Sequence, residues 1–417
     1  MQDLRGNVSY DPLSILRIYS ETNMQNYIYA YDFAQQISPN LTVQQVKPVI
    51  FNLVQEGFIT YDKKSEKIEI KPKVSHYVLA NAEKKDYDDI TFLSNNKVKN
   101  ASINLDSKSL NLEGVKKIPI SMANSTLFFP DSQKVTIEKN RNMLFDGLFF
   151  SGRIDFFGTD NHFIYDDFTM ELPQIDTLII NIPDGDKLNQ YGQAVLRPIK
   201  STLSELSGSL KINLPNNKSG NSDLAQFPIF ESISSSKVFY EDNKIGGGAY
   251  KKEDFYYEIS PFIIDSLMHI NQQTLKFNGQ LYSGGIFPNI AQDLRLQDDL
   301  SLGFQVSTPV EGLPVYGGKG MSAGELSLDN KGLTGSGLVE FQTTKFESGH
   351  ITYYPDSLLA ATDRFTIKES EGLYEAPEVN NTFSSVQWFP YLDSMIANSG
   401  PTSPFNMFNN KTQLNGQ

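Results

Sequence analysis

The chain has 417 residues, more than one typical domain, so its length predicts either two or three compact domains or one elongated, repetitive domain. Lys and Arg together number 36 and Asp and Glu 49, and the resulting net charge of −13 repels phosphate backbones and anionic lipid surfaces, which excludes nucleic acid as a favoured partner. The absence of cysteine excludes disulfides, thiolate zinc sites and cysteine nucleophiles.

Both ends of the chain are predicted to lie outside compact structure. Residues 1–20 are predicted as a linker, and their start, Met1–Gly6, lacks the basic and apolar regions of a signal peptide. Residues 396–417 are rich in Asn, Ser, Pro and Gly and are predicted as a disordered tail or linker. We expect the sequence to be part of a longer chain, and no apolar run approaches the roughly 20 residues of a transmembrane helix.

Residues 21–88 are predicted to form a small helical module. Tyr27–Ile37 has a helical period, and Thr42 can cap a second helix that closes at Gly57. Pro48 lies inside this second pattern and is expected to kink the helix or delay its start.

A β-wing follows the two helices. Phe58–Tyr61 and Lys67–Ile70 flank a polar turn and predict a hairpin, so the module resembles a winged helix. Acids and bases balance between Glu21 and Lys73, and no Arg is present there to read guanine. We therefore favour structural packing or protein contact over DNA binding for this module.

Residues 89–395 are predicted to be a β-rich, repetitive scaffold. Short β-type runs are separated by Gly, Pro, Asn and Asp, and residues 263–272 are the one weak helical candidate. Three pairs of segments echo one another: Phe145–Gly152 with Phe277–Gly284, Leu127–Ser132 with Thr352–Ser357, and Asp167–Leu178 with Asp254–Leu267. Glycine inside a strand serves a bulge, a corner or a close neighbouring backbone, so its recurrence favours stacked, solenoid-like units. Chance likeness between aromatic strands is the alternative.

Metal chemistry is poorly supported. The histidines His76, His162, His269 and His350 lie far apart in sequence and are interpreted as lone surface or core residues. Asp184 and Asp186 flank a glycine and are weak candidates for a structural calcium ion, whereas the alternative is that they are solvated turn residues. No other cofactor is predicted.

No catalytic residue is assigned. A polygalacturonase-like set would combine Asp160-Asn161, Asp298-Asp299 and Ser348-Gly349-His350, but the first two motifs lie far apart and Ile351 replaces the glycine expected after the histidine. We interpret these as independent surface features. Gly317–Gly320 lacks the Ser or Thr that follows the lysine of a phosphate loop, so it is interpreted as a flexible turn.

In its general sequence pattern the chain resembles the large uncharacterised envelope proteins of Bacteroidota. The landmarks are Pro215–Gly220, Asp299–Phe304 and Val315–Gly320, together with the echoes above. The resemblance implies a bacterial cell envelope, periplasmic or cell-surface, with other envelope proteins or the rest of a longer chain as partners, and it implies no activity. Strands such as Leu206–Leu210 show a fainter similarity to AsmA-like envelope proteins, which implies an open β-groove and lipid transfer.

Three functions follow as hypotheses. The first is a non-enzymatic structural or adhesive β-scaffold. The second is a lipid-carrying groove, which predicts an uncovered line of apolar side chains. The third is a carbohydrate-binding or carbohydrate-cleaving module, which predicts exposed aromatics such as Trp388, Tyr353 or Tyr354, although Trp388 is interpreted as a core residue.

Overall fold

The computed structural model describes residues 11–82, 86, 90–138, 140–241, 246–371, 377–400 and 402–414. The chain divides into a first unit, Met1–Ile90 with Leu214–Asp223, and a second unit, Thr91–Asn213 with Leu224–Gln417. The sequence placed a boundary at residues 88–89, beside this division, but gave no sign that Leu214–Asp223 joins the first unit. Met1–Gly6 and residues 415–417, parts of the predicted linker and tail, lie outside the described residues.

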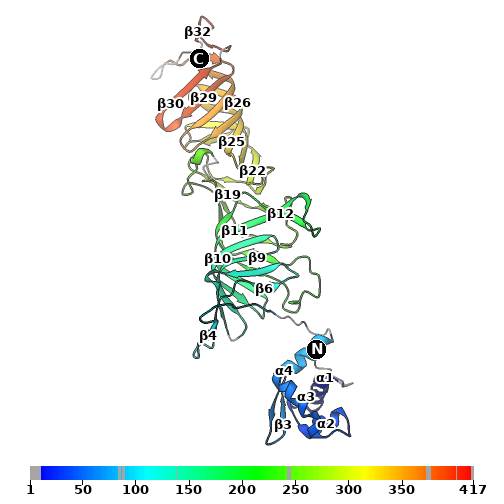
Figure 1. Cartoon of the computed structure of the whole chain (residues 1–417). Helices are drawn as coiled ribbons and strands as arrows, with labels where there is room; N and C mark the ends of the chain where they lie inside the picture. The colour runs from blue at the N-terminus through cyan, green and yellow to red at the C-terminus, as the bar shows by residue number, and fades with distance from the viewer. Residues whose placement is uncertain are drawn as a thin grey trace. The chain divides into compact units, whose positions relative to one another are not determined.

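The first unit combines helices with a small antiparallel sheet (Figure 1). Its elements are α1 (Pro12–Asn23), β1 (Tyr27–Tyr29), α2 (Ala30–Ile37), α3 (Val43–Gln55), β2 (Ile59–Asp62), β3 (Lys67–Ile70) and α4 (Pro72–Asn81). The sheet order is β1-β3-β2. Apolar residues from the helices and the sheet share one core, which includes Leu16, Ile28, Phe33, Ile50 and Ile68.

Two helices lie where the sequence analysis expected none. Helix α1 occupies part of the predicted linker 1–20, because Oδ1 of Asp11 accepts a hydrogen bond from the Leu13 amide at 3.1 Å and Leu13 is buried. Helix α4 begins at Pro72 and buries Val74. Pro12 and Pro72 both stand in the first turn of a helix, where the fixed φ of proline is favourable.

The two predicted helices were nearly right. Tyr27–Tyr29 is a strand and not the first turn of a helix, because it pairs with β3 and buries Ile28, while α2 begins at Ala30. Helix α3 begins directly after Thr42, whose amide donates to the Gln45 side chain at 2.9 Å. Pro48 lies inside α3 without delaying its start, and Gly57 ends it with a φ of +72°.

The second unit is built from two large antiparallel sheets. The first contains β4 (Ala101–Ile103), β5 (Leu110–Glu113), β6 (Ile118–Ser121), β7 (Thr126–Pro130), β8 (Lys134–Ile137), β9 (Met143–Ser151), β10 (Ile154–Ile164), β11 (Thr169–Leu188), β12 (Ala194–Pro198), β13 (Leu203–Lys211), β14 (Ile229–Ser232), β15 (Ser236–Phe239), β16 (Phe255–Ile259), β17 (Ile263–Ile264), β19 (Gly279–Ser283) and β20 (Ile290–Ala291). Its main path is β20-β19-β16-β15-β13-β11-β10-β9-β8-β5-β4. Strands close in sequence therefore lie side by side, as Figure 1 shows for β9, β10 and β11.

The second sheet repeats this arrangement. It contains β18 (Lys276–Phe277), β21 (Leu294–Leu296), β22 (Leu302–Ser307), β23 (Leu313–Val315), β24 (Gly320–Asp329), β25 (Gly332–Phe341), β26 (Thr344–Tyr353), β27 (Leu358–Ile367), β28 (Val379–Asn381), β29 (Ser384–Phe389), β30 (Ser394–Ser399), β31 (Phe405–Met407) and β32 (Thr412–Leu414). The prediction of a mainly β chain is confirmed. The prediction of a solenoid is not supported, because successive strands form antiparallel hairpins in open sheets and not stacked coils.

A chain of phenylalanine rings runs through the core of the second unit. The rings contact one another in the order Phe145, Phe128, Phe149, Phe156, Phe230, Phe262 and Phe277, with centroid separations of 4.8, 5.8, 4.5, 5.1, 5.9 and 5.0 Å. Phe145 lies in the first sheet and Phe277 in the second. We call these seven residues the ring chain; its half-buried member Phe262, which lies in no strand, connects the buried rings of the first sheet to Phe277.

The echo between Phe145–Gly152 and Phe277–Gly284 has a local structural basis. A Cβ added to Gly147 would lie 2.6 Å from the Phe129 carbonyl oxygen, and one added to Gly279 would lie 2.0 Å from that of Glu258. Both glycines therefore admit a close neighbouring backbone, one of the three roles that the sequence left open. The echo is not a copied sheet unit, because Phe277 and Gly279 belong to different sheets.

Two further sequence predictions within the second unit were wrong. The predicted tail 396–417 contains the last residues of β30 together with β31 and β32, which are held by backbone pairing more than by apolar burial. The helical candidate 263–272 holds β17 and turns, because the Asn271 side chain accepts from the Gln273 amide at 2.9 Å and favours a turn.

Candidate interaction surfaces

The calcium candidates lie at the exposed end of β11. Oδ2 of Asp184 accepts from Lys187 Nζ at 2.6 Å, and Oδ1 lies 3.1 Å from Arg197 Nη1. The hydrogen bond from Lys187 and the charges of Lys187 and Arg197 hold the pKa of Asp184 below its usual range. Asp186 is exposed. Within the described ranges no three His, Asp or Glu side chains are placed to hold one metal ion, so the calcium site stays a prediction.

The histidines do not gather at one place. His162 lies in β10 between two carboxylates: Nε2 is 3.3 Å from Glu138 Oε2 and Nδ1 is 3.4 Å from Glu171 Oε2. His350 lies in β26 of the second sheet, whereas His162 lies in β10 of the first; His76 lies in α4 of the first unit. His162 therefore joins neighbouring β-hairpins.

The polygalacturonase-like motifs are dispersed. Asp160 lies in β10 of the first sheet and His350 in β26 of the second. Asp299 orders a turn, since its Oδ1 accepts from the Ser301 amide at 3.0 Å. Asp160, Asp299 and His350 therefore belong to three different elements.

The aromatic residues named for carbohydrate binding are mostly internal. Trp388 and Tyr353 are both 0% exposed, which confirms Trp388 as a core residue. The Trp388 ring lies 4.5 Å from that of Phe341 and 5.4 Å from that of Tyr316. These rings stabilise the second sheet and do not line a cleft.

Tyrosine hydroxyls connect the two sheets of the second unit. The Tyr240 hydroxyl donates to the Leu302 carbonyl at 3.0 Å, and the Tyr250 hydroxyl donates to the Tyr353 carbonyl at 2.7 Å. Burial raises the pKa of both Tyr240 and Tyr250, and it raises the pKa of Tyr353 to about 12. These hydroxyls stay neutral at physiological pH and act as hydrogen-bond donors.

The outer face of the first sheet carries an apolar surface that the sequence analysis missed. Its members are Leu127 and Phe129 of β7, Leu148 and Phe150 of β9, Phe157 of β10 and Ile179 of β11, all half-buried or exposed. Phe129 pairs with Leu148, which in turn pairs with Phe157, and Leu127 pairs with Phe150. The rings of Phe129 and Phe150 lie 5.1 Å apart, which connects these pairs, and Ile179 adjoins them across Asp155. Side chains directly opposite on antiparallel strands are in contact, so these six residues form one surface, the outer aromatic patch.

A carboxylate lies within the outer aromatic patch. Asp155 pairs with Phe150 on one side and Ile179 on the other. Burial among these apolar neighbours raises its pKa, and a hydrogen bond to Asn181 partly opposes that shift. A partner that covered the patch would have to satisfy this carboxylate.

Phe-Phe dipeptides were the sequence signal for this patch. Side chains alternate between the faces of a strand, so each dipeptide places one ring inward and one outward. Phe149 and Phe156 belong to the ring chain, while their neighbours Phe150 and Phe157 belong to the outer aromatic patch.

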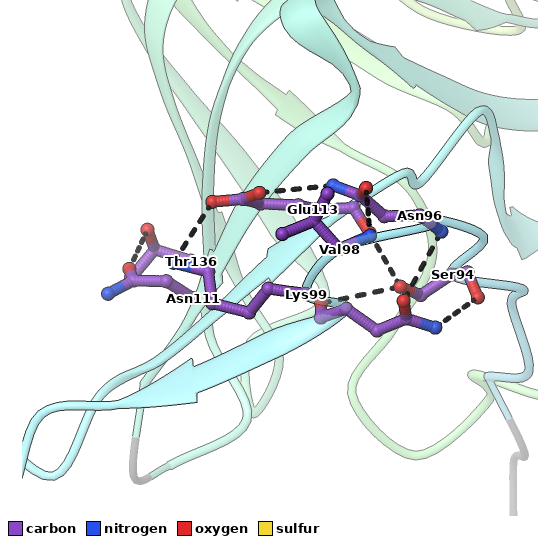
Figure 2. Close-up of polar contacts among 8 residues, drawn as sticks. Ser94, Asn96, Val98, Lys99, Asn111, Glu113 and Thr136 are labelled. Carbon is purple, nitrogen blue, oxygen red and sulfur yellow. Dashed lines mark hydrogen bonds and ion pairs between the residues drawn. The ribbon is translucent and has the colours of Figure 1, made fainter.

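A polar network covers the end of the first sheet beside β4 and β5 (Figure 2). The Glu113 carboxylate accepts from Asn96 Nδ2 at 3.1 Å and lies 3.3 Å from Lys99 Nζ. The Ser94 hydroxyl donates to the Glu113 carbonyl at 2.6 Å. These polar groups therefore satisfy one another where β5 ends and β4 begins.

Comparison with known proteins gave no matching family model, no matching curated protein and no matching solved structure. In the described part of the chain, the helices are all too short or too polar to cross a membrane.

Proposed function

We propose that the chain is a non-enzymatic structural scaffold of a bacterial cell envelope that also makes adhesive contacts. The ring chain carries the proposal, because it links buried rings of the first sheet, through the half-buried Phe262, to Phe277 of the second sheet. Tyrosine hydroxyls add hydrogen bonds between the sheets at Leu302 and Tyr353. Such a core transmits load between the sheets, which is what a scaffold requires.

The outer aromatic patch is the surface proposed for adhesion. Phe157 is 37% exposed, and its neighbours on the patch are half-buried, so apolar area remains accessible on an open sheet face. Other envelope proteins, or the rest of a longer chain, are the proposed partners. The envelope location rests on the resemblance to Bacteroidota envelope proteins.

The first unit is proposed to be a winged-helix-like module that contacts protein. The element order α1, β1, α2, α3, β2, β3 with sheet order β1-β3-β2 supports this, because a helical group followed by a two-stranded wing defines such a module. Helix α3 exposes Phe51 and Asn52, and it has one base, Lys47, and no Arg. A helix face with a single base and an exposed aromatic ring suits protein better than a DNA groove.

The alternative functions lack a comparable observation. A lipid groove needs a long uncovered line of apolar side chains, whereas the ring chain is buried at Phe149, Phe156 and Phe230 and Asp155 interrupts the outer aromatic patch. A glycan cleft needs exposed rings, whereas Trp388 and Tyr353 are buried. We therefore place the scaffold first.

The proposal is tested by complementation in the bacterium that encodes the chain. Deletion of the gene is expected to sensitise cells to detergent, and the wild-type chain is expected to restore resistance from the envelope fraction. The double variant Asp184→Asn/Asp186→Asn should restore resistance fully, because a scaffold uses no metal or catalytic carboxylate there. Phe150→Ser/Phe157→Ser should restore it poorly while keeping the fold, because it removes the adhesive surface.

Two outcomes contradict the proposal. One is recovery of the chain in the cytoplasmic fraction alone. The other is loss of complementation by Asp160→Asn or Asp299→Asn in a chain that melts like the wild type, since that result would indicate chemistry at a carboxylate.

A further inference from the structure

Sheet edges in this protein are mostly protected. In the described sheets, β4 has three residues and begins beside the network of Figure 2, and β12 carries Arg197 and Pro198. Strand β6 contains Pro119, and β23 contains Pro314. Short length, charge and proline all hinder the addition of a further strand to an edge.

Strand β30 lacks each of these protections. Among the described strands it pairs with β29 alone. Its six residues make it longer than any other described strand that pairs on one side only. Its register with β29 is unbroken from Ser394 to Ser399, with no bulge to twist it away. Its sequence, Ser-Met-Ile-Ala-Asn-Ser, contains no charge and no proline. From Ser394 to Asn398 no described strand pairs with the outer side of β30, so alternate backbone groups there can pair with a further strand.

The sequence of β30 is complementary to itself when it is reversed. Antiparallel pairing centred on Ile396 places Ile396 opposite its own copy, Met395 opposite Ala397, and Ser394 opposite Asn398. Apolar residues then meet apolar ones and polar residues meet polar ones. Such pairing satisfies a two-fold axis, because the same residues contribute from both copies.

Local charge permits two acidic chains to meet at this edge. The chain carries −13 overall, but the nearest charge in the sequence, Asp393, accepts from Lys319 Nζ at 2.7 Å. Leu392, directly before it, is 74% exposed, and Ile396 is 50% exposed. Pairing would bury both apolar side chains or bring them close to the partner.

We propose that two copies of this chain associate through antiparallel pairing of β30 with β30, so that the second sheet continues from one copy into the other. The partner is a second copy and not an unrelated peptide, because the strand matches its own reversed sequence. The interface is a single strand edge with few flanking residues, so it belongs to the small, reversible class. The inference is independent of the scaffold proposal.

Sedimentation velocity on the full chain tests the association. Between about 1 and about 100 μM, a range suited to small interfaces, the wild type should pass from monomer to dimer. Ile396→Lys places two ammonium groups opposite each other and should leave the chain monomeric, with at least a tenfold weaker association. Val310→Lys is the matched control, because Val310 is 99% exposed in a loop of the same unit, and it should dimerise like the wild type.

A charge pair gives a second readout. Mixing Ile396→Lys with Ile396→Glu should restore dimers that neither variant forms alone, and both variants should melt like the wild type. A wild type that stays monomeric throughout the range overturns the proposal, as does an Ile396→Lys chain that dimerises normally.

The absence of cysteine permits a position-specific check. Ile396→Cys should form a covalent dimer when treated with diamide, because directly opposed residues bring their Cα atoms within the 4.4–6.8 Å that a disulfide spans. Val310→Cys is the control for random collision. Equal cross-linking of the two variants would contradict pairing centred on Ile396.

Discussion

Phe156→Ala is the substitution that most sharply probes the core of the second unit. Phe156 is 0% exposed, and its ring lies 4.5 Å from that of Phe149, with an angle of 5° between the ring planes, and 5.1 Å from that of Phe230. Removing a fully buried phenylalanine costs about 3–5 kcal/mol, and two ring contacts are lost with it, so we expect a loss of about 4 kcal/mol. With an m value of about 3 kcal/mol/M, the urea midpoint should fall by about 1.3 M.

The single tryptophan makes this substitution a test of coupling between the sheets. Trp388 is buried in the second sheet, whereas Phe156 lies in the first, so tryptophan fluorescence reports unfolding at a distance from the substitution. If the ring chain joins the sheets, Phe156→Ala should lower the midpoint of the fluorescence transition as much as the midpoint seen by far-ultraviolet circular dichroism.

Phe157→Ala is the matched control. It removes the same side chain from the adjacent residue, but Phe157 is 37% exposed on the opposite face, so we expect a loss of about 1 kcal/mol. The reasoning is refuted if Phe156→Ala leaves the Trp388 transition at its wild-type midpoint, or if the two variants lose the same stability.

Three further predictions use the same measurements. Tyr250→Phe removes a buried hydroxyl that donates to the Tyr353 carbonyl and accepts from the Leu333 amide. The free energy of unfolding measured in urea should therefore fall by about 1–3 kcal/mol, and an unchanged urea midpoint would contradict a role of this hydroxyl in connecting the sheets. Burial raises the pKa of Asp155 above its unfolded value, so between the two pKa values the folded state binds more protons and the stability of the fold falls as pH rises. Asp155→Asn should therefore be more stable than the wild type at pH 7, and the difference should shrink as pH falls below the raised pKa. A difference in stability that stays constant with pH would contradict the assignment. Lys187 and Arg197 already neutralise Asp184, so calcium should leave the melting temperature unchanged, and a rise that Asp184→Asn abolishes would establish the calcium site.

Sequence patterns predicted the class of the fold because they depend on local chemistry. Alternating apolar residues and recurrent glycines indicated strands, and Gly147 does lie against a neighbouring backbone. Thr42 and Gly57 marked the ends of a helix because capping depends on neighbouring residues alone. The helix at Pro12–Asn23 was missed although its Asp-Pro start is a local signal.

Pairing between strands distant in sequence determined the features that local sequence patterns did not predict. Tyr27–Tyr29 has a pattern compatible with helix, and its pairing with β3 makes it a strand. Strands β31 and β32 bury little, so their polar sequences resembled a tail. The outer aromatic patch depends on the register of four strands, which no single segment encodes, although the Phe-Phe dipeptides gave a partial sign.

Native-state hydrogen exchange tests the central claim most directly. Amides of β9, β10 and β11 in the first sheet and of β25, β26 and β27 in the second can be followed as urea is added below the unfolding transition. One core spanning both sheets predicts that the slowest amides of the two groups converge on the same opening free energy. Two separate limiting values, with the second sheet opening while the first stays protected, would contradict a shared core.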